Sequence, residues 1–179
     1  MIAILAVLLS LAPAAPARAA ALKAGDTAPD ICAPLSDGTT FRLRDWLPRA
    51  PLVLYFYPKD FTPGCTKEAC SLRDEFSALR GLNATVVGIS YDSVASHKKF
   101  IAKHHLPFPL VSDPDHAAAK AFGVAGWLFA DRATFIVGRD GRILWADPSV
   151  NPSTHARELR AALAKLAPAP GAGAATKAP

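Results

Sequence analysis

Cysteine, aromatic residues and long apolar runs are all scarce in this 179-residue sequence. Its three cysteines are too few to build a small disulfide-stapled scaffold. Beyond Ile2–Ala12, no apolar run approaches the roughly 20 residues that span a bilayer, which excludes a polytopic membrane protein. The basic residues form no arm, and their densest cluster, at 96–105, is predicted to be the solvated face of a helix. Nucleic-acid binding is therefore not expected.

The two ends of the chain differ in composition from its middle. Ile2–Ala12 is almost uninterruptedly apolar and is followed by a small-residue A-R-A sequence, the pattern of a secretory signal. We therefore predict a signal peptide over 1–19, a periplasmic or secreted location, and no stable membrane association after cleavage. Because no Lys or Arg precedes the apolar stretch, an uncleaved interfacial anchor is the alternative. Residues 168–179, rich in Ala, Pro and Gly, predict a disordered tail, which leaves a single domain over 20–167.

The middle of the chain alternates between strand and helix patterns, which predicts an α/β domain with a mixed sheet. Leu52–Tyr57 and Ala84–Ser90 are continuous apolar runs of the kind that form buried central strands. Each is followed by a helical pattern, and a hairpin and a helix close the domain. The predicted strands span 31–35, 39–43, 52–57, 84–90, 110–112, 134–137 and 142–146, and the predicted helices span 64–80 (with Gly81 as a left-handed cap), 94–105, 116–122 and 154–166.

The segment that follows the first buried strand contains the candidate catalytic residues. Thr62 is a suitable N-cap and Pro63 a suitable first helical residue, which places Cys65 in the first turn of a helix. Free backbone N–H groups and the positive end of the helix dipole favour a thiolate there. Cys65 is therefore a candidate nucleophile, and the alternative is a small buried cysteine that happens to begin a helix.

A second cysteine, Cys70, lies five residues further on. A helix turns by about 100° per residue, so Cys65 faces inward with an apolar stripe of the helix. Cys70 lies about 140° around the helix from Cys65, on the side that faces solvent. Their Cα atoms would be about 8–9 Å apart, beyond the roughly 7 Å limit for a disulfide, so the two can bond only if the helix unwinds. If peroxide converts Cys65 to a sulfenic acid, Cys70 can condense with it to form an easily reduced disulfide.

The motif P-x-x-x-T-x-x-C is formed by Pro58, Thr62 and Cys65. Cys70 follows five residues after Cys65 and completes the pattern. At these residues the sequence resembles the peroxiredoxins of the Q type, also called bacterioferritin comigratory proteins, in their atypical two-cysteine subgroup. The resemblance extends from about Gly25 to Leu166 and includes GDTAPD, LPFPLVSDP and R-A-T-F-I-V. It implies a thioredoxin-like fold and thiol-dependent reduction of hydrogen peroxide and alkyl hydroperoxides. It also implies a thioredoxin-like reductant, a monomer, and neither cofactor nor metal.

The resemblance further implies roles for individual residues. Thr62 would donate a hydrogen bond to the bound peroxide, and Pro58 would shield the thiolate from water. Arg132 would hold the peroxide and support the thiolate, in agreement with the ability of a guanidinium to stabilise both charges. The alternative is a strand-edge arginine paired with Asp131 or Glu68, and Glu68 is also a candidate for orienting the guanidinium.

Two features depart from that family pattern. Phe61 replaces a residue that is commonly polar, and the loop at 126–131 is short, so access to the pocket is expected to differ. Export would also separate the protein from a cytosolic thioredoxin, so a periplasmic thioredoxin-like donor is expected.

The remaining cysteine and the histidines carry weaker signals. Cys32 is expected to be a semi-buried small residue of the entry strand, with a second resolving role as the alternative. None of the five histidines has ligand spacing with the cysteines, and His104 and His105 are expected at the surface, so metal ligation is not predicted.

Two thioredoxin-like alternatives compete with the peroxidase. A disulfide-exchange protein would need C-x-x-C, whereas this chain has C-x4-C. A copper-binding module would need two thiolates and a histidine around one ion, which the placement of Cys65 and Cys70 on different helix faces argues against.

Overall fold

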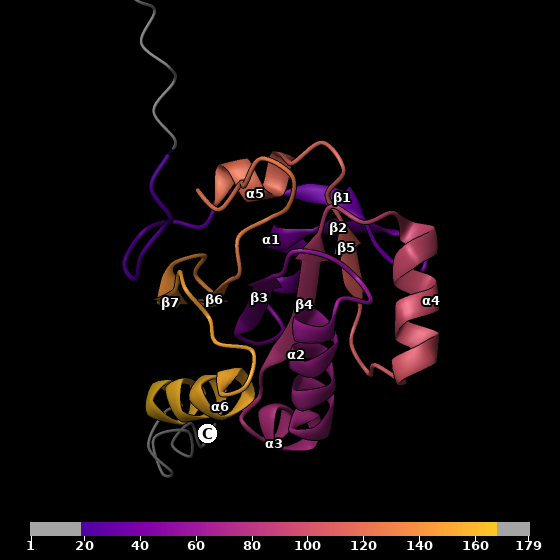
Figure 1. Cartoon of the computed structure of the whole chain (residues 1–179). Coiled ribbons are helices and arrows are strands. Elements are labelled where there is room, and N and C mark those ends of the chain that lie inside the picture. Colours follow the sequence, from indigo (N-terminus) through magenta and orange to yellow (C-terminus); the bar gives the residue numbers. More distant parts are fainter. Residues whose placement is uncertain (1–18, 168–179) are drawn as a thin grey trace, which may run out of the picture.

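A mixed five-stranded sheet forms the centre of the protein. The computed structural model describes residues 19–167 (Figure 1), so most of the predicted signal peptide and the predicted tail at 168–179 lie outside the described residues. From one edge to the other, the strands are β5 (Leu110–Ser112), β4 (Thr85–Ser90), β3 (Leu52–Phe56), β6 (Ala133–Val137) and β7 (Ile143–Asp147). β3 is parallel to β4 and antiparallel to β6, which confirms the predicted α/β fold with a mixed sheet.

The central strand explains how the two layers of helices arise. All five residues of β3 are buried, as expected for an apolar run covered on both faces. Leu52, Leu54 and Phe56 belong to one core cluster, whereas Val53 and Tyr55 belong to the other, so alternate side chains point to opposite faces.

Helices cover both faces of the sheet (Figure 1). The Val53 side packs against apolar residues of α2 (Pro63–Asp74), α3 (Phe76–Gly81), α4 (Val94–His104) and α6 (His155–Leu166). The opposite side packs against α1 (Leu43–Trp46), α5 (Ala117–Ala121) and a separate hairpin of β1 (Cys32–Pro34) and β2 (Thr40–Arg42). No helix within residues 19–167 is long and apolar enough to cross a membrane.

The predicted helix at 64–80 is in fact two helices, which corrects the sequence-based expectation. The break lies at Glu75, whose backbone (φ −90°, ψ 0°) leaves the helical region and whose carboxylate pairs with Arg160 of α6 at 3.0 Å. Gly81 is the last residue of α3 rather than a left-handed cap, and Asn83 takes the positive φ (57°) instead. The short helix α1 was not predicted.

Gly88 of β4 lets Tyr55 of the neighbouring strand lie across it. A Cβ at position 88 would lie 2.6 Å from both Tyr55 Cζ and Leu110 Cδ2. We predict that Gly88→Ala lowers the free energy of unfolding by about 1–3 kcal/mol in a denaturant titration, because buried neighbours must shift. Gly81→Ala is the matched control, since no atom lies within 4 Å of its Cβ position, and it should be neutral or slightly stabilising. Equal losses in the two variants would contradict this account of the packing.

Candidate active site

The sheet register brings Cys65 and Arg132 to the same corner of the molecule. β3 runs through a short loop into α2, and Cys65 lies in the first turn of that helix, 2% exposed. β6 runs antiparallel to β3 and pairs Ala133 with Phe56, the last residue of β3. Arg132 immediately precedes β6, so it lies beside the loop that leads into α2. Residues 67 positions apart in the sequence are thereby placed in contact.

The guanidinium of Arg132 bridges a thiol and a carboxylate. Its Nη2 donates to Cys65 Sγ at 3.2 Å, and its Nη1 donates to the fully buried carboxylate of Glu68. Burial opposes the charge of Arg132, but the neighbouring Glu68 and Cys65 raise the pKa of the guanidinium above its ordinary value. A permanent positive charge next to Cys65 favours the thiolate form. Pairing with Glu68, considered as an alternative role for Arg132, therefore coexists with contact to the sulfur.

Sequence reasoning missed two residues that extend this cluster. His155 Nδ1 lies 2.9 Å from Glu68 Oε1, although the two atoms are not aligned as a hydrogen bond, and His155 Nε2 lies 2.9 Å from Thr134 Oγ1. Neither His155 nor Thr134 is exposed. No local spacing links a histidine at the start of α6 to a glutamate in α2, so the sequence offered no signal for this contact.

Thr62 and Pro58 lie in the loop before α2, as predicted. Thr62 takes the N-cap position and Pro63 begins the helix, but the threonine side chain does not cap it. Instead, Thr62 Oγ1 donates to the carbonyl of Lys59 at 3.0 Å, which corrects the expectation of a side-chain cap. Pro58 is half-buried and lines a shallow pocket of about 200 Å³ together with Leu128 and Phe129 from the loop before Arg132.

The three cysteines have different surroundings and are all free thiols. Cys65 is buried and Cys70 is only partly so, in agreement with the predicted opposite orientations. Cys70 Sγ lies 3.8 Å from His104 Nδ1, a contact that corrects the expectation of a surface histidine unrelated to the cysteines. Cys32 is exposed rather than semi-buried, because it lies on the outer face of the separate β1–β2 hairpin.

Comparison with known proteins assigns this site to a family. The AhpC/TSA family model matches residues 24–146. The chain belongs to the AhpC/TSA family. Peroxiredoxin Bcp of Bacillus subtilis (strain 168) is 38% identical over 145 residues, which cover 76% of this chain and 92% of the relative. Peroxiredoxin Q, chloroplastic, of Oryza sativa subsp. japonica is 37% identical over 167 residues, which cover 84% of this chain and 77% of the relative.

Solved structures agree with the sequence relatives. Peroxidoxin BcpB of Mycobacterium tuberculosis superposes with a TM-score of 0.78 at 37% identity, over 81% of this chain and 98% of the other. Xanthomonas campestris peroxiredoxin Q superposes with a TM-score of 0.74 at 38% identity, over 77% of this chain and 92% of the other. The protein is thus a thioredoxin-like peroxiredoxin of the Q or Bcp type and a thiol-dependent peroxidase, which favours this activity over copper binding or disulfide exchange. Among residues 19–167, no group of three or more His, Cys, Asp or Glu side chains could hold a metal ion.

A buried polar network anchors the active-site loop of the peroxiredoxin to α4. Asp60 accepts hydrogen bonds from Tyr57 and Ser96, both at 2.7 Å, and its Oδ2 lies 3.0 Å from His97 Nδ1. His97 Nε2 lies 3.2 Å from the Val111 carbonyl, so this nitrogen carries a hydrogen. His97 has no exposed surface, which corrects its predicted place on a solvated helix face.

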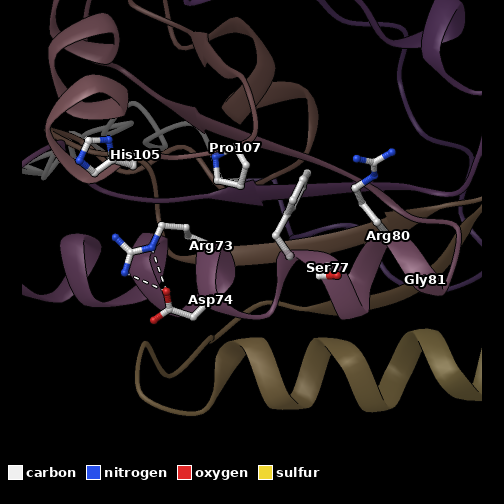
Figure 2. Close-up of a pocket in the computed structure, with 8 residues that line it drawn as sticks. Arg73, Asp74, Ser77, Arg80, Gly81, His105 and Pro107 are labelled. Atoms are coloured by element: carbon white, nitrogen blue, oxygen red, sulfur yellow. Dashed lines mark hydrogen bonds and ion pairs between the residues drawn. The ribbon is translucent and has the colours of Figure 1, made fainter.

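A wide groove lies along the end of α2 and α3 (Figure 2). Its volume is about 610 Å³, and its lining includes the two cations Arg73 and Arg80 and one carboxylate, Asp74, which pairs with Arg73 at 2.8 Å. The groove is lined by Arg73, Asp74, Phe76, Ser77, Arg80, Gly81, His105 and Pro107. Arg73 Nη1 also donates to the backbone carbonyl of His104 at 2.8 Å, so one end of the groove lies beside the end of α4.

The Asp60 network predicts a specific pH dependence of stability. Burial opposes the ionisation of Asp60, but His97, Ser96 and Tyr57 outweigh it and lower the pKa of the carboxyl. The stabilisation is therefore complete above the unfolded-chain pKa of about 3.9 and is lost as pH falls through the folded value. We expect Asp60→Asn to cost about 3 kcal/mol at pH 7 and progressively less below about pH 4 in urea titrations. The exposed Asp115→Asn is the control, and a pH-independent loss in Asp60→Asn would refute the prediction.

Because Arg132 contacts both Glu68 and Cys65, we predict that mutations can separate its effect on the stability of the protein from its effect on the reactivity of Cys65. Arg132→Met leaves the Glu68 carboxylate buried without its cation, which should cost about 3–5 kcal/mol of unfolding free energy. Adding Glu68→Gln removes that charge and should restore much of the stability. Peroxide oxidation of Cys65 should remain about 100-fold slower in both variants, because the donor to the reacting centre is missing. Recovery of the oxidation rate together with the stability would show that Arg132 acts only through the fold.

Proposed function

We propose that Cys65 is the peroxidatic nucleophile for hydrogen peroxide and alkyl hydroperoxides. The observation that carries this proposal is the 3.2 Å contact between Cys65 Sγ and the Arg132 guanidinium in the first turn of α2. The thiolate attacks one peroxide oxygen, the O–O bond breaks, and Cys65 becomes a sulfenic acid. The other oxygen leaves as alkoxide or hydroxide and is protonated to alcohol or water. The positive charge of Arg132 stabilises the charge that develops on the peroxide oxygens.

Thr62 and Pro58 complete the proposed peroxide site. Thr62 was expected to donate a hydrogen bond to the peroxide, but its hydroxyl hydrogen points to the Lys59 carbonyl. In this rotamer, Thr62 Oγ1 is free to accept a hydrogen bond from the terminal O–H of a hydroperoxide. Pro58 lies in the loop between β3 and α2, and we assign it the role of an apolar wall that limits the access of water to the thiolate.

Cys70 is the proposed resolving cysteine. Cys65 is buried and Cys70 is turned towards a different side of α2, so the first turn of α2 must unwind before the two sulfurs meet. Attack by the Cys70 sulfur on the Cys65 sulfenic acid forms a disulfide and releases water. A thioredoxin-like dithiol donor would then reduce that disulfide. Arg73, three residues after Cys70 in α2, lines the groove of Figure 2, which supports approach of the donor from that side.

The proposed setting is outside the cytoplasm. The apolar stretch and A-R-A sequence within residues 1–19 support export, and the mature protein would then depend on a periplasmic thioredoxin-like donor. We propose a monomer for this form, as the resemblance to the Q-type peroxiredoxins implies.

Cysteine variants test the reaction sequence. After one equivalent of hydrogen peroxide, peptide mass mapping should find a Cys65–Cys70 disulfide in the unsubstituted protein. Cys70→Ser should stop at a dimedone-trappable sulfenic acid on Cys65 and overoxidise with excess peroxide, and Cys65→Ser should consume no peroxide. Cys32→Ser is the control and should behave like the unsubstituted protein. A Cys65–Cys32 linkage would overturn the role of Cys70, whereas peroxide consumption by Cys65→Ser would overturn the nucleophile. The intact mass of exported protein also reports the mature N-terminus.

A further inference from the structure

The end of α4 is held against Cys70 by a pair of contacts. His104 Nδ1 lies 3.8 Å from Cys70 Sγ. From the same stretch of α2, Arg73 Nη1 donates to the backbone carbonyl of His104 at 2.8 Å. The second contact fixes the backbone that carries the imidazole, so the nitrogen facing Cys70 is held in place by more than its own side-chain rotamer.

Aromatic rings define the remaining sides of the His104 imidazole. Phe100, one turn earlier in α4, packs edge-on against it with ring centroids 5.0 Å apart. The ring centroid of Phe61 lies 6.4 Å from that of His104. The backbone of Phe61 adopts a positive φ of 61°, an uncommon conformation for a bulky residue. These rings leave Nδ1 directed at the sulfur and make the imidazole half-buried.

We infer that His104 is the general base that activates Cys70 in the resolving step. This inference rests on the proposed function, in which Cys70 attacks the sulfenic acid of Cys65. His104 Nδ1 accepts the Cys70 thiol proton as the Cys70 sulfur bonds to the Cys65 sulfur. The S–O bond of the sulfenic acid breaks, and the departing hydroxide takes a proton to leave as water. The imidazolium returns its proton to solvent, so one sulfenic acid and one thiol yield one disulfide and one water.

The charges around His104 keep its imidazole able to accept a proton at neutral pH. Partial burial lowers the pKa of His104, and the positive charges of Lys103, Arg73 and His105 lower it further. Lys103 also lies over the Phe61 ring, and Asp74, the nearby carboxylate, is held by Arg73. The groups facing His104 from α2 and from the end of α4 therefore oppose the imidazolium form.

The contact can persist while α2 opens. Cys65 lies in the first turn of α2, whereas Cys70 and Arg73 lie in its later turns, where Leu72 is fully buried in the core. Unwinding of the first turn displaces Cys65 and leaves Cys70 beside His104. The base thus remains next to the attacking sulfur in the step that needs it.

The test is a single-turnover reaction of the reduced protein with one equivalent of hydrogen peroxide. Samples are quenched with acid and a thiol-alkylating reagent, and intact mass follows the sulfenic acid and the disulfide separately. His104→Gln should leave sulfenic acid formation unchanged and slow disulfide formation about tenfold at pH 7. The expected ceiling is about 30-fold, because an ordinary cysteine thiol is already a few per cent ionised at that pH. The slower variant should also accumulate more sulfinic acid when peroxide is in excess.

The pH profile separates a base from a structural role. From about pH 7 upward, disulfide formation should be nearly flat in the unsubstituted protein. In His104→Gln it should rise with pH and converge with the unsubstituted rate above about pH 9, where thiols ionise unaided. A variant that is slow at every pH would overturn the inference by showing only a structural effect.

A neighbouring histidine supplies the matched control. His105→Asn alters an exposed residue with positive φ, which asparagine tolerates, and it should change neither phase. Identical rates and pH profiles in His104→Gln and the unsubstituted protein would also overturn the inference while leaving the proposed function intact. Absence of a Cys65–Cys70 disulfide in the unsubstituted protein and in both variants would instead show that the proposed resolving step is wrong. The role inferred for His104 would then be wrong as well.

Discussion

The site depends on one guanidinium that meets two needs. Glu68 is a fully buried carboxylate, and such a group requires a cation or strong hydrogen bonds to remain ionised. Arg132 supplies that cation and, through its other terminal nitrogen, contacts the sulfur of Cys65. The pairing of β3 with β6 places Arg132 there, so the geometry of the proposed nucleophile follows from the register of the central sheet. The requirement of the fold for charge neutrality and the requirement of the chemistry for a stabilised thiolate are thereby met by the same side chain.

A second constraint acts in the opposite direction, because the proposed cycle needs part of this site to open. The loop before α2 is anchored firmly through Asp60 and His97, whereas the first turn of the helix has no side-chain cap from Thr62. The helix is also short, since it breaks at Glu75. Local opening of the first turn can therefore occur without loss of the anchored loop or of the core beneath α2. In this arrangement the proposed nucleophile lies in a helix turn that the Thr62 side chain does not cap.

The sequence predicted what depends on local pattern. The buried strands at 52–57 and 84–90, the placement of Cys65 in the first turn of a helix and its inward orientation all follow from periodicity and helix-start signals, and the structure confirms them. The family resemblance, not the spacing, pointed to Arg132. Contacts that depend on tertiary packing were not predictable. His97 and His104 looked like members of a solvated cluster, but one is buried beneath the active-site loop and the other lies against Cys70.

The central claim is that position and charge, rather than exposure, make one thiol reactive. The protein contains its own comparison, because Cys32 is exposed whereas Cys65 is 2% exposed beside Arg132. The most direct measurement treats the reduced protein with a tenth of an equivalent of hydrogen peroxide and maps oxidation at each cysteine by differential labelling. The account predicts that essentially all oxidation begins at Cys65. Oxidation of Cys32 at a comparable or greater rate would contradict it.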